Sequence, residues 1–367
     1  MMREVARRFR AGGRDTGFRK THLKRPWKRF LCLLLLAAVL LGGCSARQAQ
    51  PQPKQYTASF LNLFDTVTTI VGRAESEEAF QAQAQEIHDA LLEYHQLFDI
   101  YSEYEGVANL KTVNDHAGVS PVQVDGRIIE LLTDCRRYWE FTGGKVNAAM
   151  GSVLSLWHEA RNEGVDDPAN AVLPDESALK EAALHMDFGS VVIDEAASTV
   201  YFSDPDIRLD VGAIAKGWAT QRVCEQSPSG LLISVGGNVC ATGPKDESGT
   251  PWVIGIQDPD GGDYLHTIYV EKGSVVTSGD YQRAYMVEGK LYHHIIDPDT
   301  LYPSEYWRSV TVVCPDSGLA DALSTALFVL PQEEGQALLD ESGAEAVWVN
   351  RAGELAYSPG FKDLIRT

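Results

Sequence analysis

The segment from residue 231 to residue 279 restricts the fold most, because strand-forming runs follow one another there with only turn residues between them. LLISVGGNV (231–239) is an apolar run that contains a glycine pair, and WVIGIQDPDGGDYLHTIYVEKGSVVTSG (252–279) contains further runs rich in Val, Ile and Tyr. Successive strands joined by short turns pair in the antiparallel sense. Helices and strands therefore come in runs, and we predict an α+β fold of largely antiparallel sheets with peripheral helices. A parallel doubly wound sheet is disfavoured.

Two long amphipathic helices are expected before this segment. Apolar Ile87, Leu91 and Phe98 recur at helical spacing within residues 77–101, and residues 125–141 repeat the pattern before a glycine pair. The other expected elements are a strand over 56–72, a polar connector over 159–175, a short helix over 177–185, a hairpin over 191–202, a strand over 310–313 and an apolar helix over 319–330.

The N-terminus has the organisation of a secretory signal. Residues 1–29 contain eleven Lys or Arg and two acidic residues, and they precede the apolar segment FLCLLLLAAVLL (30–41). This segment is shorter than a helix needs to be to cross a bilayer. The following LGGC resembles a bacterial lipobox, which predicts a lipoprotein signal peptide over 1–43, lipid attachment at Cys44 and a flexible tether over 44–55. This implies a lipid-anchored protein on the extracytoplasmic face of a bacterial cell membrane. The alternative is a plain secretory signal with a buried cysteine.

The rest of the chain is acidic and carries no paired-cysteine motif. After Cys44 there are 21 Lys or Arg against 49 Asp or Glu, which argues against nucleic acid or an anionic membrane surface as a direct partner. The remaining cysteines show no C-x-x-C spacing, so neither a zinc site nor a redox pair is indicated. We expect buried free thiols, with an extracytoplasmic disulfide as the alternative; the four are Cys135, Cys224, Cys240 and Cys314.

RLDVGAIAKGW (208–218) places an acid at a strand end directly before the start of a helix. Asp210 lies between apolar neighbours, Gly212 opens a run of small residues, and Lys216 and Gly217 follow in the expected first turn. Unpaired N–H groups at a helix N-terminus favour an anionic group such as a phosphate. The alternative is a capping Asp before an ordinary helix with an exposed Lys.

The apolar helix expected over 319–330 is interrupted by two polar residues. Asp321 and Thr325 are four residues apart and so share one helix face. A buried carboxylate needs a partner, and hard oxygen ligands suit magnesium, which can also bridge to phosphate. The alternative is an Asp in the N-terminal turn and a Thr bonded back to the helix backbone.

The neighbouring histidines His293 and His294 are not expected to bind one metal together, since neighbours on a strand face opposite sides.

Five motifs in order resemble the ApbE family of FAD:protein FMN transferases, over roughly residues 60 to 355. They are DVGAIAKG (210–217), SVGGNVCATG (234–243), VTSGDYQR (276–283), HHIIDPDT (293–300) and LADALSTAL (319–327). The resemblance implies the family's fold for a single catalytic domain over 56–367. It also implies magnesium held by Asp321, Thr325 and the backbone carbonyl of Ala213.

The same resemblance assigns residues to the flavin substrate. Tyr104 aligns with a ring that stacks on isoalloxazine, and Phe64 stands where the family has a Met against the flavin. The other residues expected to contact FAD are Asn147, Asp210, Lys216 and Ile296. The chain departs from the family pattern at three further positions, with Ala108 for Ser, Asn147 for Asp and Leu301 for Gly.

The activity that the resemblance implies is magnesium-dependent transfer of the FMN moiety of FAD onto a Thr or Ser hydroxyl of an extracytoplasmic acceptor protein, with release of AMP. His294 is the candidate base, because an unperturbed His titrates near neutral pH. The alternatives are an FAD pyrophosphatase that yields FMN and AMP, a non-catalytic FAD-binding lipoprotein, and a purely structural lipoprotein.

Overall fold

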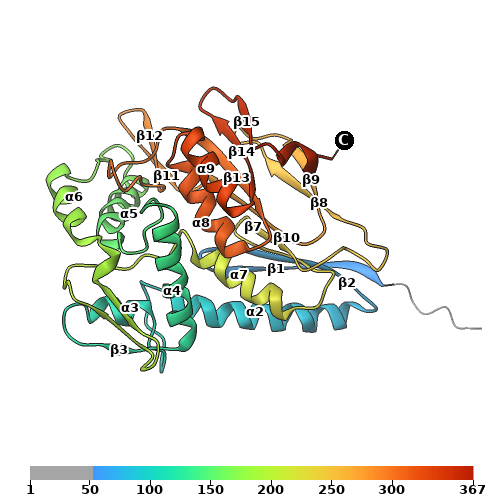
Figure 1. The fold of residues 1–367 in the computed structure, drawn as a ribbon, viewed down its shortest axis with the longest axis horizontal. Coiled ribbons are helices and arrows are strands. Elements are labelled where there is room, and N and C mark those ends of the chain that lie inside the picture. Colours follow the sequence, from blue (N-terminus) through green and yellow to red (C-terminus); the bar gives the residue numbers. More distant parts are fainter. Residues whose placement is uncertain (1–52, 367) are drawn as a thin grey trace, which may run out of the picture. The chain divides into compact units, whose positions relative to one another are not determined.

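The computed structural model describes residues 53–366 and is built around an eight-stranded, wholly antiparallel sheet (Figure 1). The predicted signal peptide, Cys44 and most of the predicted tether lie outside the described residues. In spatial order the strands are β1 (Lys54–Leu63), β2 (Thr66–Ala74), β6 (Leu232–Val235), β7 (Asn238–Ala241), β10 (Gly273–Gly279), β13 (Trp307–Cys314), β14 (Glu345–Asn350) and β15 (Leu355–Tyr357).

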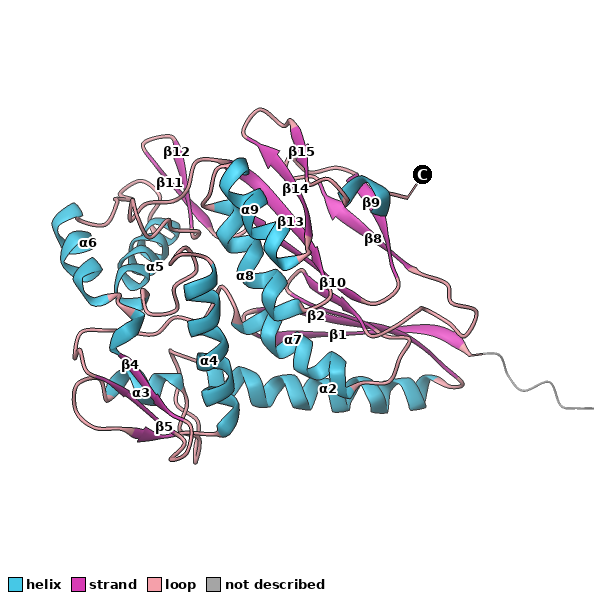
Figure 2. Ribbon diagram, viewed as in Figure 1, coloured by secondary structure: helices cyan, strands magenta, loops and turns pink. Residues whose placement is uncertain are grey.

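Helices and smaller sheets surround this sheet (Figure 2). The helices are α2 (Glu77–Phe98), α3 (Leu110–Asp115), α4 (Gly126–Phe141), α5 (Gly151–Asp166), α6 (Glu176–Ala182), α7 (Ala215–Gln226), α8 (Ser317–Phe328) and α9 (Gln332–Ser342). The smaller sheets pair β3 (Val122–Gln123), β5 (Thr199–Phe202) and β4 (Val191–Asp194), then β8 (Trp252–Gln257) with β9 (Tyr264–Val270), and β11 (Ala284–Val287) with β12 (Lys290–His293). Within residues 53–366, no helix has the length and apolar character needed to cross a bilayer.

Side-chain alternation along the strands gives the large sheet two buried faces. On β6, Ile233 packs with the helices α2 and α7, whereas Leu232 packs under the β8–β9 hairpin. On β14, Trp348 faces α8 and α9, whereas Val347 faces the hairpin. A strand with apolar residues on both faces belongs in the middle of a layered domain. The antiparallel α+β architecture with peripheral helices is thus confirmed.

Several expected boundaries were wrong in detail. The strand expected over 56–72 is the β1–β2 hairpin, whose turn holds Phe64 and Asp65 at φ of 53° and 52°. The run 231–239 also folds into a hairpin, because Gly236 and Gly237 adopt φ of 58° and 91° and reverse the chain. The expected connector over 159–175 is wrong in its first half, where α5 continues to Asp166 with an exposed polar face.

The cysteine prediction is confirmed for the described part of the chain. Each of the four thiols is buried and free, namely those of Cys135, Cys224, Cys240 and Cys314.

Candidate functional site

Helices α7 and α8 approach each other closely at Gly217. A Cβ atom at this position would lie 2.3 Å from the Ser317 carbonyl oxygen and 2.5 Å from Cβ of Asp321. The Gly217 backbone N–H donates to Oδ2 of Asp321 at 2.8 Å. Glycine is therefore required by the space available, and the close approach brings the 208–218 stretch against the acid of the apolar helix.

Asp321 is a buried carboxylate with little compensation from the protein. It is 4% exposed, and the nearest cation of the described residues is Lys216, whose Nζ lies 3.9 Å from Oδ2. Burial raises the pKa of Asp321, and the Lys216 charge offsets part of that rise. A carboxylate in this position is favourable when a further positive charge sits beside it.

The backbone of the 208–218 stretch supplies a second oxygen. The Gly217 N–H would donate to the Ala213 carbonyl in a continuous α-helix, but it donates to Asp321 instead, while Trp218 N–H makes the regular bond to Ile214 at 2.9 Å. The Ala213 carbonyl is thereby released from that helix bond. Together with the hydroxyl of half-buried Thr325, one turn after Asp321, the set offers the hard oxygens that magnesium prefers. These residues fit the ion.

The two neighbouring histidines differ in their hydrogen bonds, although both line one narrow hollow. His293 is buried, its Nε2 lies 2.8 Å from the Ser304 carbonyl, and its Nδ1 accepts from Ile295 N–H at 3.2 Å. His294 has a buried Nδ1 with no partner among the described residues. Burial, followed by nearby positive groups led by Arg283, lowers its pKa to about 3. The expectation that His294 titrates near neutral pH is therefore wrong, although its neutral ring retains a free lone pair.

Phe64 and Tyr104 meet at a residue that the sequence did not single out, His95 of α2. The His95 ring packs edge-on against Phe64 at 5.5 Å between centroids and against Tyr104 at 6.3 Å. His95 Nδ1 accepts from the Phe64 backbone N–H, and Asp99 accepts from the Tyr104 hydroxyl at 2.7 Å. Burial and the Asp99 bond raise the pKa of Tyr104 to about 12. Two aromatic rings are thus held at one place, which suits a flat conjugated ligand.

Asp210 lies at the edge of a cavity of about 420 Å³. Its Oδ1 accepts from Gly212 N–H at 2.8 Å, and its Oδ2 lies 4.0 Å from Nε2 of His158 on α5. The cavity is lined by Ile100, Tyr101, Gly151, Ser155, His158, Glu159, Asn162, Glu163, Asp166 and Asp210. His158 also lines a narrow hollow that contains His294, so this residue connects the Asp210 cavity with the candidate base.

Three further positions named from the resemblance make contacts within the protein. The Asn147 amide donates to the Met186 carbonyl at 2.8 Å and accepts from Ala149 N–H at 2.9 Å, so both ends are engaged within the protein. Ile296 is buried in the cluster that joins α5 to β11. Leu301, which stands where the family has Gly, adopts φ of 62° and keeps the turn closed through a bond to the Asp297 carbonyl at 2.8 Å.

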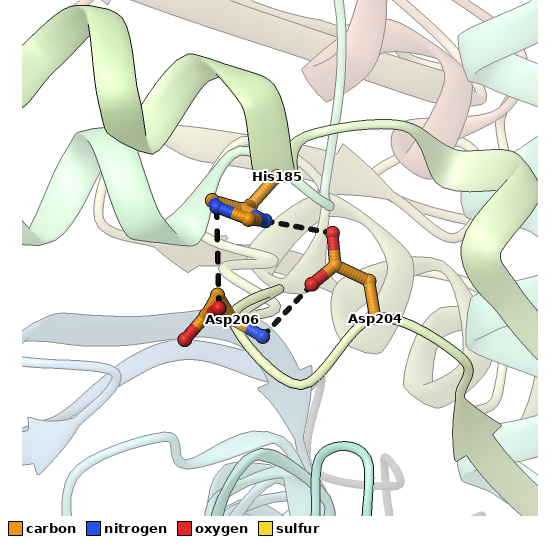
Figure 3. A group of neighbouring side chains, drawn as sticks. All are labelled: His185, Asp204 and Asp206. Atoms are coloured by element: carbon orange, nitrogen blue, oxygen red, sulfur yellow. Dashed lines mark hydrogen bonds and ion pairs between the residues drawn. The ribbon is translucent and has the colours of Figure 1, made fainter.

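A second group of metal-ligand types lies where the turn at Ala183–His185, before β4, meets the loop after β5. His185 Nδ1 lies 2.8 Å from Oδ2 of Asp204, and its Nε2 lies 4.0 Å from Oδ2 of Asp206 (Figure 3). The hydrogen bond to Asp204 raises the pKa of His185. The Asp206 side chain is 66% exposed, so this group behaves as a solvated ion pair. The acids at 258–260 also form a turn, in which Asp260 pairs with Arg308.

Comparison with known proteins identifies relatives over most of the chain. A family model described as the ApbE family matches residues 64–348. A protein of Treponema pallidum (strain Nichols) named FAD:protein FMN transferase is 35% identical over 307 residues, which cover 77% of this chain and 83% of the relative. A protein of the same name from Escherichia coli (strain K12) is 28% identical, covering 90% of this chain and 96% of the relative.

Solved structures share the fold. The crystal structure of the ApbE protein of Thermotoga maritima superposes with a TM-score of 0.75 at 30% identity, covering 86% of this chain and 100% of that chain. The flavin transferase ApbE of Vibrio cholerae gives a TM-score of 0.70 at 24% identity, covering 85% and 99%, which supports the fold alone.

Proposed function

This chain belongs to the ApbE family, and from that premise we propose that it is an FAD:protein FMN transferase that works with magnesium and releases AMP. The observation that carries the proposal is the oxygen set at the contact between α7 and α8. There the cation nearest to the buried Asp321 carboxylate among the described residues is Lys216, at 3.9 Å, and the Ala213 carbonyl is released from its helix bond. Such a set accommodates a divalent ion beside a pyrophosphate.

Bound magnesium supplies charge neutralisation on the pyrophosphate oxygens during phosphoryl transfer. The chain's own contribution begins with Lys216, whose Nζ donates to the Gly212 carbonyl at 2.9 Å and stays within 4 Å of Asp321. In this position the ammonium steadies the negative charge of the substrate phosphates.

The transfer step exchanges one phosphorus–oxygen bond for another. The acceptor hydroxyl oxygen bonds to the flavin-side phosphorus, the bond from that phosphorus to the AMP oxygen breaks, and the hydroxyl proton goes to a base. His294 remains the candidate for this base, because its ring is neutral and its Nδ1 has no hydrogen-bond partner among the described residues. Its lowered pKa makes it a weak base in the free protein, and the negative charge of bound FAD would raise that pKa.

The flavin end is held by Phe64 and Tyr104, whose rings both contact His95. The raised pKa of Tyr104 keeps its hydroxyl protonated and bonded to Asp99, which fixes the ring orientation. The faces of the two aromatic rings would then stack on the isoalloxazine ring.

The acceptor is proposed to be an extracytoplasmic flavoprotein with a Thr or Ser flavinylation site. Support comes from the basic and apolar N-terminus and from LGGC, which places Cys44 where a lipid anchor is expected. An enzyme tethered in this way would act at the outer surface of the cell membrane.

Product analysis tests the proposed function. The full chain in detergent is incubated with FAD and magnesium, with and without a candidate acceptor domain from the same genome, and AMP and free FMN are separated chromatographically. We expect AMP to appear with the acceptor while FMN stays on protein. Equal release of AMP and free FMN without acceptor would identify a pyrophosphatase, and FAD bound without any AMP would identify a carrier.

A further inference from the structure

His158 bridges two groups from distant parts of the chain. Its Nδ1 lies 2.9 Å from the Tyr101 hydroxyl, and its Nε2 lies 4.0 Å from Oδ2 of Asp210. The side chains of His158 and Asp210 are 24% and 10% exposed, so the pair is largely shielded from solvent. Imidazole presents its two nitrogens on opposite sides of the ring, which lets a single residue join the tyrosine to the carboxylate.

Tyr101 is itself fixed to the segment that carries the flavin-stacking candidate. Asp99 accepts from the Tyr101 backbone N–H at 2.7 Å through Oδ1, and from the Tyr104 hydroxyl at 2.7 Å through Oδ2. A continuous series of polar contacts therefore runs from Tyr104 through Asp99, Tyr101 and His158 to Asp210. It joins the loop after α2, the helix α5 and the 208–218 stretch.

Electrostatics define which atom donates at each contact. Tyr101 is 62% exposed and keeps its proton at neutral pH, because the pKa of a tyrosine is about 10, so its hydroxyl donates to His158. Burial is the main cause that lowers the pKa of His158, with Arg161 and Arg283 acting in the same direction and Asp210 against it. A neutral ring that accepts at Nδ1 carries its proton on Nε2, and this N–H faces Asp210.

We propose that His158 is a positioning residue for FAD, which holds the Asp210 carboxylate toward the cavity and ties it through Tyr101 to the Tyr104 loop. Asp210 uses Oδ1 for the Gly212 N–H, and the His158 ring lies 4.0 Å from Oδ2, where it limits the space in which this oxygen can turn. A carboxylate fixed in advance accepts from an amino or hydroxyl group of the nucleotide without reorganising. The inference rests on the proposed assignment of Asp210 and Tyr104 to FAD.

Three substitutions separate positioning from general stability. His158→Ala removes both contacts, His158→Gln keeps an acceptor for Tyr101 and an N–H donor for Asp210, and Tyr101→Phe removes the hydroxyl alone. Val165→Ala is the matched control, since Val165 lies on the same helix and is 58% exposed. The FAD dissociation constant is measured by flavin fluorescence on the full chain with magnesium, together with KM and kcat for FAD.

We expect His158→Ala to weaken FAD binding and raise its KM by about tenfold, with kcat changed less, because the Asp210 carboxylate is then held through Oδ1 alone. His158→Gln is expected to recover most of the affinity, Tyr101→Phe to lose about threefold, and Val165→Ala to match the wild type. In an Asp210→Asn background, His158→Ala should have little further effect, because the two residues act through one contact.

Unchanged FAD affinity in His158→Ala would overturn the inference, as would fully additive effects of the His158 and Asp210 substitutions. Equal loss of affinity in His158→Ala and His158→Gln, accompanied by equal loss of melting temperature, would also overturn it by showing a purely structural role. The proposed function has its own readout, which is the release of AMP by the wild type. A wild type that binds FAD tightly and releases no AMP would refute the transferase proposal. The FAD affinities of the His158 variants would still decide whether His158 positions FAD.

Discussion

The backbone N–H of Gly217 and the carboxylate of Asp321 are joined by a 2.8 Å hydrogen bond at the contact of α7 with α8. This bond gives Asp321 a backbone donor and frees the Ala213 carbonyl, and the close approach of the two helices leaves room only for glycine at this position. The proposed metal site thus follows from how two helices pack.

Gly217→Ala should disrupt this packing. The new methyl group would meet the Ser317 backbone at 2.3 Å, so a shift of α7 against α8 is expected to cost about 1–3 kcal/mol in the free energy of unfolding and to impair magnesium-dependent activity. Denaturant unfolding measures the cost. Gly126→Ala in α4 is the control, because no atom lies within 4 Å of its added Cβ. Equal stability of the two variants would contradict the packing argument.

Asn114→Ala should destabilise the protein from a position remote in sequence. The buried Asn114 amide donates to the Leu209 carbonyl at 3.0 Å and accepts from the Leu209 N–H at 2.8 Å. Its removal leaves two buried backbone groups unpaired, at a cost of about 3 kcal/mol. Calorimetry against the exposed Asn170→Ala checks this, and a melting temperature like that of the control would refute it.

Local pattern predicted much of the fold, since antiparallel pairing follows from strands separated by short turns, and helix faces follow from apolar spacing. The placement of Asp321 and Thr325 on one helix face could also be predicted from the sequence, because they are four residues apart. His95 and His158 carry no local signal, as their partners are distant in sequence. The release of the Ala213 carbonyl depends on a contact between helices, and such contacts are set by tertiary packing.

His293 should make the protein sensitive to mild acid. Burial lowers its pKa to about 4, so the unfolded chain takes up a proton near pH 6.5 while the folded protein does not. Stability present above pH 6.5 is therefore lost as the pH falls toward 4, at up to about 1.4 kcal/mol per pH unit for this group. We expect His293→Gln to unfold with a shallower pH dependence between pH 6.5 and 4.5, whatever its stability at neutral pH. Parallel slopes for the two proteins would exclude this role.

Tyr104→Ala should reduce FAD affinity more than it reduces stability. The ring is half-buried and its removal eliminates the proposed stacking surface, for which a loss of about tenfold in affinity is expected. Fluorescence titration measures the affinity, and Tyr264→Ala serves as the control because Tyr264 on β9 is 65% exposed. Retention of wild-type affinity in Tyr104→Ala would place the isoalloxazine ring elsewhere.

The most direct test of the account is the intact mass of a candidate acceptor domain after incubation with the full chain, FAD and magnesium. We predict a gain of one FMN moiety less water with the wild type and with Asp340→Asn, which changes an exposed acid on α9. We predict no gain with Asp321→Asn, because the buried carboxylate that would hold the metal is lost. Transfer at the wild-type rate by Asp321→Asn would contradict the proposed metal site. An acceptor that gains no mass with the wild type, while AMP and free FMN accumulate, would contradict the transferase function.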